Sequence, residues 1–392
     1  MPERNPHRQL SPTRSSPTAI IIGAGVVGLG VAWRLAQGGA RVTVFDKSAA
    51  GSGASHAAAG MLAVCAEAEP GERDLVVLGR RSQALWPEFA AELEATTGLE
   101  IDLRAEGTLV VAMTAAERAR VTHHLAYQQS LALPVEWISA ADARRREPLL
   151  APGLVGAVWS PQDHQVDNRK LVAALSIAAS RAGVSVRGHC AVHRLLIKND
   201  RAVGVALDDG SEINADVVVV AAGAWSRGVE GLPPALRPPV RPVKGQMIAL
   251  QMDPQAPSIT HVIRAHNVYM VPRRDGRLII GATTEEKGFD ATLTAGGVLA
   301  LLEAAWRLVP SIEELPIAEM WVGHRPGTRD DAPILGPGPI DGLVYATGHH
   351  RNGILLAPVT ASMIARLVLE GVPDSTIRPF GLERFTNVRA AE

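Results

Sequence analysis

Cysteine is almost absent from this sequence of 392 residues, which contains only Cys65 and Cys190. Two cysteines cannot build the disulfide framework that stabilises small secreted domains. Their scarcity is typical of a cytoplasmic protein, in which we expect both to act as small buried hydrophobic side chains.

Net charge and long apolar runs are missing as well. The formal net charge is −1, which gives no reason to expect nucleic acid or an anionic membrane as a partner. The apolar run at 217–222 is far shorter than the roughly 20 residues of a membrane span. Residues 1–17 are rich in proline, serine and arginine and lack the apolar centre of a secretory signal, so we expect a disordered tail.

The strongest motif lies in residues 18–47, TAIIIGAGVVGLGVAWRLAQGGARVTVFDK. An apolar, β-branched run predicts a buried parallel strand, and Gly23, Gly25 and Gly28 follow it in G-x-G-x-x-G spacing. A predicted helix comes next, then a second strand that ends at Asp46. The glycines allow a tight turn, close approach to a pyrophosphate and close packing of helix on strand, while Asp46 can accept both ribose hydroxyls. This order predicts a dinucleotide site.

Two later segments favour FAD over NAD. Residues 48–63 form a long run of small residues, which suits a backbone lying along an extended ligand. Residues 211–226 read as a strand ending in Ala-Gly-Ala-Trp, which resembles the second fingerprint of flavin-binding folds. Before it, a strand and a β-meander with turns at 199–200 and 209–210 are predicted, and Val192 is expected at the adenine.

The remaining segments predict an antiparallel sheet placed over the flavin. We expect strands at 107–114, 241–250 and 267–284, with a hairpin turn at 275–276, and helices at 115–131, from 165 onward and at 296–310. The predicted fold class is α/β (α+β): a glutathione-reductase-type, Rossmann-like FAD-binding domain interrupted by an antiparallel-sheet substrate domain. We assign 18–90, 150–230 and 325–375 to the FAD-binding domain and 91–149 and 231–324 to the substrate domain.

The segment TGHHRNGILLAP, residues 347–358, interrupts an apolar region with a charge and a turn. A strand is predicted before it and a buried helix over 353–369. The free N–H groups of a helix that starts at Asn352-Gly353 would face the flavin, where a positive helix end stabilises the anionic reduced form. Arg351 lies at the same junction.

Together with HRPGTRDDAPILGP at 324–337, this segment makes the chain resemble the glycine oxidases of thiamine biosynthesis, within the D-amino acid oxidase family, from Ala19 to Gly371. The resemblance implies that Arg325 binds the substrate carboxylate, that Tyr269 hydrogen-bonds the substrate and that Arg351 lies beside flavin and substrate. Some relatives carry histidine where this chain has Asn267, a difference that concerns substrate preference more than reaction type.

The expected site combines these motifs. The expected substrate contacts are Arg325, Tyr269 and Arg351. The expected cofactor contacts are Gly23, Gly25, Val26, Val27, Gly28, Asp46, Lys47, Ala54, Ser55, Ala59, Gly60, Met61, Val192, His349, His350, Arg351, Asn352, Gly353, Ile354 and Leu355.

The resemblance implies that non-covalent FAD oxidises glycine, sarcosine or small D-amino acids to the imine or glyoxylate, with oxygen yielding hydrogen peroxide. A homo-oligomer and transfer of the product to a thiazole synthase are also expected. No protein base is expected, because the best-matched side chains are two permanent cations and a phenol. No metal is expected, because adjacent His349 and His350 diverge on an extended chain and no third ligand lies nearby.

Two other functions stay open. One is a D-amino acid or N-methyl amino acid oxidase or dehydrogenase of the same superfamily. Monomeric sarcosine oxidase attaches its flavin to a cysteine in the C-terminal half, and no cysteine follows Cys190 here. The other is a non-catalytic flavoprotein that assembles a partner complex, which the pair Arg325 and Tyr269 disfavours. Taken singly, Arg325 also suits a solvated surface and Tyr269 a core.

Overall fold

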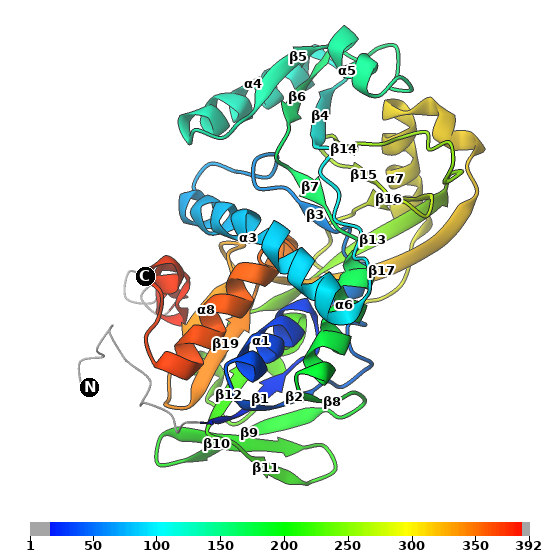
Figure 1. Ribbon diagram of the computed structural model, residues 1–392. Coiled ribbons are helices and arrows are strands. Elements are labelled where there is room, and N and C mark those ends of the chain that lie inside the picture. Colours follow the sequence, from blue (N-terminus) through cyan, green and yellow to red (C-terminus); the bar gives the residue numbers. More distant parts are fainter. Residues whose placement is uncertain (1–15, 386–392) are drawn as a thin grey trace.

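The computed structural model describes residues 16–385 and contains two large sheets joined by several crossings of the chain (Figure 1). The disordered tail expected at 1–17 lies outside the described residues except for its last two. No helix within the described range is both long and apolar enough to cross a membrane.

The six-stranded sheet is built around the first strand, as the glycine motif predicts. Its order is β18-β19-β12-β1-β2-β8. The strands are β1 (Thr18–Ile22), β2 (Arg41–Phe45), β8 (Ser185–Arg187), β12 (Val217–Val220), β18 (Ile334–Pro337) and β19 (Leu343–Thr347). β18 pairs antiparallel with β19, whereas the other neighbouring pairs are parallel. Because β1 lies in the middle of a parallel sheet, both of its faces are covered and its sequence is a continuous apolar run.

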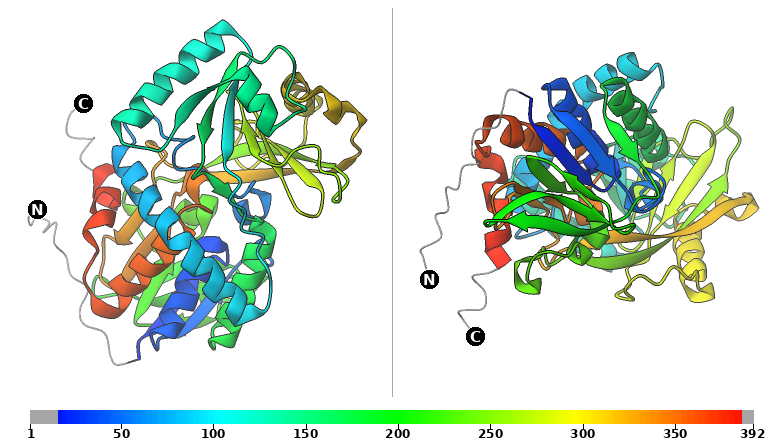
Figure 2. Two further views of the ribbon diagram at one scale, coloured as in Figure 1. Left: turned by 45° about the horizontal axis from the view of Figure 1, so that its top comes forward. Right: turned by 90° about the horizontal axis from the view of Figure 1, so that it is seen from below.

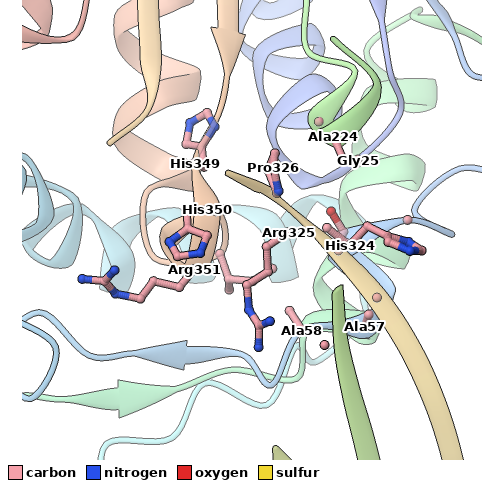
Figure 3. Close-up of a pocket in the computed structure, with 18 of the residues that line it drawn as sticks. Gly25, Ala57, Ala58, Ala224, His324, Arg325, Pro326, His349, His350 and Arg351 are labelled. Carbon is pink, nitrogen blue, oxygen red and sulfur yellow. The ribbon is translucent and has the colours of Figure 1, made fainter. Parts of the chain in front are cut away.

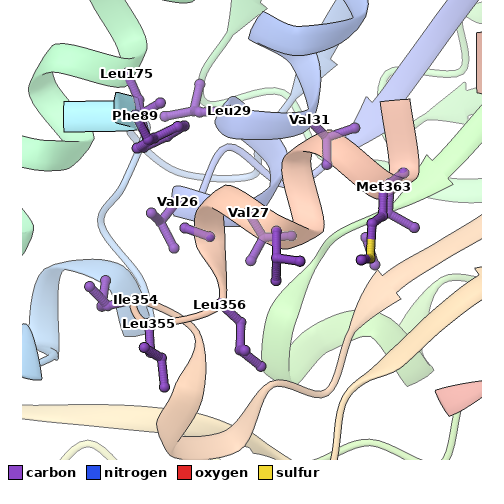
Figure 4. Packing of buried hydrophobic residues seen from close by; sticks show 14 of the residues in the cluster. Val26, Val27, Leu29, Val31, Phe89, Leu175, Ile354, Leu355, Leu356 and Met363 are labelled. Carbon is purple, nitrogen blue, oxygen red and sulfur yellow. The ribbon is translucent and has the colours of Figure 1, made fainter. Parts of the chain in front are cut away.

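Four helices pack against one another (Figures 1 and 4). They are α1 (Val26–Gln37), α3 (Arg73–Thr97), α6 (Asn168–Arg181) and α8 (Ala357–Glu370). Three of them, α1, α6 and α8, cover one face of this sheet, and α3 packs on the helices. No helix was expected over the residues of α3. Its Trp86 and Phe89 meet edge to face at 5.6 Å, and Phe89 meets Trp33 of α1 at 5.7 Å. These aromatic contacts tie α3 to the helix that follows the glycine turn.

A small meander extends from the six-stranded sheet, with β9 (Val192–Lys198), β10 (Arg201–Leu207) and β11 (Glu212–Asn214). Asn199 and Asp200 both have positive φ, as a two-residue hairpin turn requires, so the predicted turn is confirmed. The strand predicted over 211–226 is interrupted, since β11 ends at Asn214 and β12 begins at Val217. Asp216 accepts hydrogen bonds from the backbone and side chain of Thr18 and redirects the chain into the parallel sheet.

The eight-stranded sheet has the order β17-β13-β16-β15-β14-β4-β6-β5. Its strands are β4 (Thr108–Ala112), β5 (Glu136–Ser139), β6 (Gly156–Ser160), β13 (Arg241–Gln251), β14 (Val262–Arg264), β15 (Tyr269–Pro272), β16 (Arg277–Gly281) and β17 (Ile317–Gly327). Neighbours pair antiparallel except β14 and β4. The strands and the hairpin predicted for this region are confirmed.

Shorter elements complete the fold. The helices are α2 (Ala54–Ala57), α4 (Ala115–Ser130), α5 (Ala140–Arg146) and α7 (Ala295–Leu308), and β3 (Met61–Leu62) pairs with β7 (His164–Gln165). The 3-10 turns are η1 (Gly223–Gly228), η2 (Pro234–Leu236), η3 (Pro310–Glu314), η4 (His350–Asn352), η5 (Ser375–Phe380) and η6 (Leu382–Phe385). α7 packs its buried side chains into the core of the eight-stranded sheet, and the views of Figure 2 show it on the side away from α3.

Three boundaries differ from those expected. α6 begins at Asn168 and not at Gln165, because the Asp167 side chain accepts from the N–H groups of Arg169 and Lys170 and caps the helix there. β6 pairs within the eight-stranded sheet, although 150–230 was assigned to the FAD-binding domain. β17 likewise runs past the boundary placed at 325. The two-domain division itself stays a prediction.

Candidate active site

A cavity of about 940 Å³ lies where the two sheets meet. Small-molecule sites in proteins typically enclose about 300–1,000 Å³, so this cavity suits a large ligand. Its wall comes from the ends of β1, β2 and β12, the loop at 51–61, strands β13, β15 and β17, and the segment 349–355. Figure 3 shows several of these segments converging on it. Every predicted site residue lines the cavity except Gly28.

The glycine turn has the geometry that its sequence predicts. Gly23 has φ +109°, and a Cβ there would collide with the carbonyl oxygen of Ala221. A Cβ on Gly28 would collide with the carbonyl oxygen of Gly23, so Gly28 serves close packing and does not line the cavity. The Ser55 hydroxyl accepts from the N–H of Val26 at 2.9 Å and covers the first turn of α1. This cradle fits a dinucleotide, whose pyrophosphate approaches the backbone at Gly25.

Asp46 lies directly after β2, where a ribose-binding acid is expected. Its carboxylate accepts from the N–H groups of Ala24 at 2.7 Å and Ser48 at 2.9 Å. Next to it, the Lys47 ammonium lies 3.8 Å from the ring centroid of Trp225, and burial lowers the pKa of Lys47 while Asp46 opposes that shift. The acid is therefore oriented by the turn itself, and Lys47 is held beside it by an aromatic ring.

The segment 349–355 differs from its predicted form. The helix begins at Ala357, and η4 and a further turn precede it, so the expected helix start at Asn352-Gly353 is wrong by four residues. Pro358 occupies the first turn of α8, where a missing N–H is tolerated. Within residues 16–385, no acceptor is found for the backbone N–H groups of Ile354 and Leu355, which line the cavity. These two N–H groups can still donate to a ligand, although they belong to a turn and not to the first turn of a helix.

The two histidines of this segment are neutral. Burial lowers the pKa of His349 to about 4, and its Nε2 lies 3.1 Å from the Thr360 hydroxyl. Burial, reinforced by Arg351 and Arg325, lowers the pKa of His350 to about 3. Among the described residues, no group of three or more potential ligands could hold a metal ion.

Arg325 projects from β17 across the neighbouring strand. A Cβ on Gly245 of β13 would lie 2.5 Å from its Nη1, so the glycine makes room for the guanidinium. Nη1 donates to the carbonyl oxygen of Thr283 at 3.1 Å. No carboxylate of the chain between residues 16 and 385 pairs with Arg325, which leaves most of its planar donors available for a bidentate carboxylate.

Tyr269 stands on β15 within the same part of the cavity. Its hydroxyl donates to Met247 Sδ at 3.4 Å, and a Cβ on Gly281 would lie 2.5 Å from that hydroxyl. Burial raises the pKa of Tyr269, and Glu67 acts in the same direction, whereas Arg325 opposes the shift. The phenol is therefore protonated at neutral pH and can donate a hydrogen bond.

Arg351 lines the cavity, but its guanidinium is engaged. Its Nη2 lies 2.8 Å from Glu72 and its Nε lies 3.4 Å from Glu67, and Glu67 also forms a short ion pair with Arg264 (on β14). Figure 3 shows Arg351 pointing away from Arg325 on the other side of His350. Glu67, Glu72 and Arg264 were not among the residues expected from the sequence. The one local signal was a carboxylate, Glu67, shortly after the run of small residues at 48–63.

Comparisons with known proteins agree with this geometry. The model of the family described as "FAD dependent oxidoreductase" (DAO) matches residues 18–367. The Bifunctional protein ThiO/ThiG of Trichormus variabilis is 39% identical over 368 residues, which are 93% of this chain and 55% of that protein. The chain thus spans about half the length of the bifunctional relatives that it matches.

Solved structures cover almost the whole chain. The glycine oxidase of Geobacillus kaustophilus has a TM-score of 0.87 and 37% identity, covering 94% of this chain and 99% of that one. The iminodiacetate oxidase of Chelativorans has a TM-score of 0.84 and 30% identity, covering 93% and 98%. The predicted fold class and FAD as cofactor are confirmed. This chain belongs to the DAO family of FAD-dependent oxidoreductases.

Proposed function

We propose that this protein is a glycine oxidase that converts glycine, and related small amines such as sarcosine, to the imine with formation of hydrogen peroxide. The observation that carries the proposal is the guanidinium of Arg325, which pairs with no carboxylate among residues 16–385 and lies over Gly245 beside the protonated phenol of Tyr269. A small amino acid offers one carboxylate for Arg325 and leaves its Cα–N bond unhindered. The similarity to the glycine oxidase of Geobacillus kaustophilus supports the same substrate class.

The residues of the chain bind, orient and enclose the substrate. Arg325 holds the carboxylate in a bidentate pair, and the Tyr269 hydroxyl donates a hydrogen bond to the substrate. Bound FAD would supply the acceptor for the hydride of Cα and the route of the electrons to oxygen. The residues that fit FAD are the glycine turn, Asp46 at the adenosine ribose and the backbone donors of Ile354 and Leu355.

Neither the two histidines nor Tyr269 is suited to act as a base in this part of the cavity, and the Glu67 carboxylate is held in ion pairs with Arg264 and Arg351. His349 and His350 are neutral, with pKa values lowered to about 4 and about 3, and a phenol with a raised pKa does not abstract a proton at neutral pH. Among the charged groups around the substrate region, three arginines face two glutamates, Arg264, Arg325 and Arg351 against Glu67 and Glu72, so the net charge is 3 − 2 = +1. A positive site favours the neutral amine of the substrate.

Cellular location, flavin attachment, product transfer and oligomeric state are further parts of the proposed function. Both cysteines are unpaired, which supports a cytoplasmic location. Cys65 is buried and neither cysteine lines the cavity, which supports non-covalent FAD. Transfer of the imine to a thiazole synthase draws support from the relatives named ThiO/ThiG, in which a protein like this one is joined to a second part. A homo-oligomer is expected from the family resemblance.

A substrate panel tests the proposal. Peroxide production should be measured with glycine, sarcosine, D-alanine and D-proline at equal concentrations. A glycine oxidase should use glycine and sarcosine with similar efficiency, whereas strong preference for a bulkier D-amino acid would assign the alternative oxidase function. Anaerobic mixing with each member of the panel separates both from a non-catalytic assembly factor, because the yellow flavin of an enzyme should bleach with its own substrate.

A further inference from the structure

Four charged side chains are linked by ion pairs beside the substrate region, and three of them line one wall of the cavity. Glu67 lies between the guanidinium groups of Arg264 and Arg351, and Glu72 binds Arg351 from the other side. Arg264 belongs to the eight-stranded sheet, while Arg351 belongs to the segment before α8. Arg264, Glu67 and Arg351 line the cavity and Glu72 does not. One carboxylate therefore occupies the space between two cations contributed by different parts of the fold.

Glu67 is held in place by its backbone as well as by its ion pairs. The N–H groups of Cys65 and Ala66 donate to the two carboxylate oxygens of Asp163, at 2.9 and 2.6 Å. Asp163 is fully buried and also accepts from the Ser160 hydroxyl at 2.8 Å. A turn fixed in this way positions the next residue, Glu67, whose side chain is 11% exposed and lines the cavity.

The substrate region already has one anion site, at Arg325. Arg325, Tyr269 and Glu67 line the same cavity, so both charges face the space that a bound molecule would occupy. A substrate with a single carboxylate places that group on Arg325 and brings no second negative charge toward Glu67. A substrate with a second acidic group would bring that group toward Glu67, where like charges repel.

We propose that Glu67 masks a second anion subsite formed by Arg264 and Arg351, and thereby restricts the enzyme to monocarboxylate substrates. Neutralising Glu67 exposes two guanidinium groups to the cavity, and these accept the second carboxylate of an N-carboxymethyl amino acid. The proposal rests on the proposed function for the role of Arg325, and it adds a residue that selects substrates by charge.

Two inert ethers test the subsite directly. Methoxyacetate carries one carboxylate and oxydiacetate carries two, and neither has an amine to oxidise. Their dissociation constants are measured with the FAD-loaded protein by the change in flavin absorbance, at fixed ionic strength because salt screens charges. The wild type should bind oxydiacetate at least about tenfold more weakly than methoxyacetate, and equal affinities would overturn the proposal without any variant.

Variants then locate the effect. Glu67→Gln keeps an acceptor for both arginines and removes the charge, and it should shift the affinity ratio toward oxydiacetate by about tenfold or more. Adding Arg264→Gln to Glu67→Gln should cancel the gain. Glu72→Gln is the matched control, since it removes a charge from the same arginine outside the cavity, and the ratio should change less than about threefold. An unchanged ratio in Glu67→Gln with normal flavin content contradicts the proposal.

Kinetics give the corresponding result with substrates. Sarcosine carries one carboxylate and iminodiacetate carries two, as the two ethers do. Glu67→Gln should therefore raise kcat/KM for iminodiacetate relative to sarcosine by a similar factor. Failure of the wild type to oxidise glycine would disprove the proposed function, while the ether affinities would still decide the subsite. If glycine is oxidised but Glu67→Gln changes neither the ratio of ether affinities nor the ratio of kcat/KM values, only the subsite proposal is disproved.

Discussion

At the scale of single residues, Arg325 has the simplest test. Arg325→Ala leaves the substrate carboxylate unpaired in a partly closed cavity, and truncating one partner of a buried charge pair costs about 2–5 kcal/mol. We expect kcat/KM for glycine to fall about 30-fold or more, since about 1.4 kcal/mol is a factor of ten. Steady-state peroxide assays measure this. FAD content should be retained, and Arg194→Ala, an exposed arginine paired with Glu212, is the control. A near-normal kcat/KM for Arg325→Ala would remove Arg325 from the site.

Tyr269 tests whether a protein base exists. Its raised pKa keeps the phenol protonated, so Tyr269→Phe should slow flavin reduction only modestly, about tenfold or less, which is the scale of one neutral hydrogen bond. The rate should rise with pH along one limb set by the amine of the substrate. Stopped-flow reduction of the flavin across pH, with glycine and with an amine of different pKa, measures both. A protein base would be required if the pH limb of flavin reduction stayed fixed when the pKa of the substrate amine changed, or if Tyr269→Phe abolished flavin reduction.

His349 links the site to stability. The unfolded histidine binds a proton near pH 6.5 and the folded one near pH 4, so between these values the unfolded state holds more protons. The contribution of His349 is fully present above pH 6.5 and is lost as pH falls toward 4. His349→Gln should therefore reduce the loss of unfolding free energy between pH 7 and 5 by about 2 kcal/mol, as urea titrations would measure. His193→Gln, on a side chain that is 55% exposed, should leave the slope unchanged.

At the scale of elements, the turn between β1 and α1 depends on Gly28. A Cβ at this position meets the carbonyl of Gly23, so Gly28→Ala should destabilise the protein by about 1–3 kcal/mol and weaken FAD retention. Thermal melts with flavin quantification test this. Gly296→Ala is the control, because Gly296 lies in α7 with nothing near its added Cβ, and it should be neutral or stabilising by up to about 1 kcal/mol. Equal effects of the two changes would contradict the packing role.

The sequence allowed the elements with a local signal to be predicted. The β1-α1-β2 unit, Asp46 at the end of β2 and the turn at Asn199-Asp200 follow from glycine spacing, an apolar run and turn residues. The start of α8 was misplaced, because apolar residues in a turn against the core look like the beginning of a buried helix. Glu67 was missed for another reason: its partner Arg264 lies far away in the chain, and only folding brings the two together.

At the scale of the whole molecule, the cavity joins the two sheets, so its occupant should stabilise both. A ligand that binds only the folded state at 100 times its Kd adds about 2.7 kcal/mol. We expect acid precipitation to release FAD into the supernatant, and the melting temperature of refolded apoprotein to rise with added FAD. Differential scanning calorimetry over a series of FAD concentrations measures this. Colour retained in the precipitate would indicate a covalent flavin, and a melting temperature independent of FAD would place the cofactor elsewhere.

The order in which the cavity wall appears along the chain has a consequence for biosynthesis. The glycine turn is made first, Tyr269 and Arg325 come from the second half of the chain, and residues 349–355 close the wall last. A nascent chain that has not yet reached Leu355 lacks the backbone donors of that segment, so FAD can be retained only after nearly the whole protein has been synthesised. Loading with cofactor is thus a late event, and a ribosome stalled before residue 349 should carry a chain that does not hold the flavin.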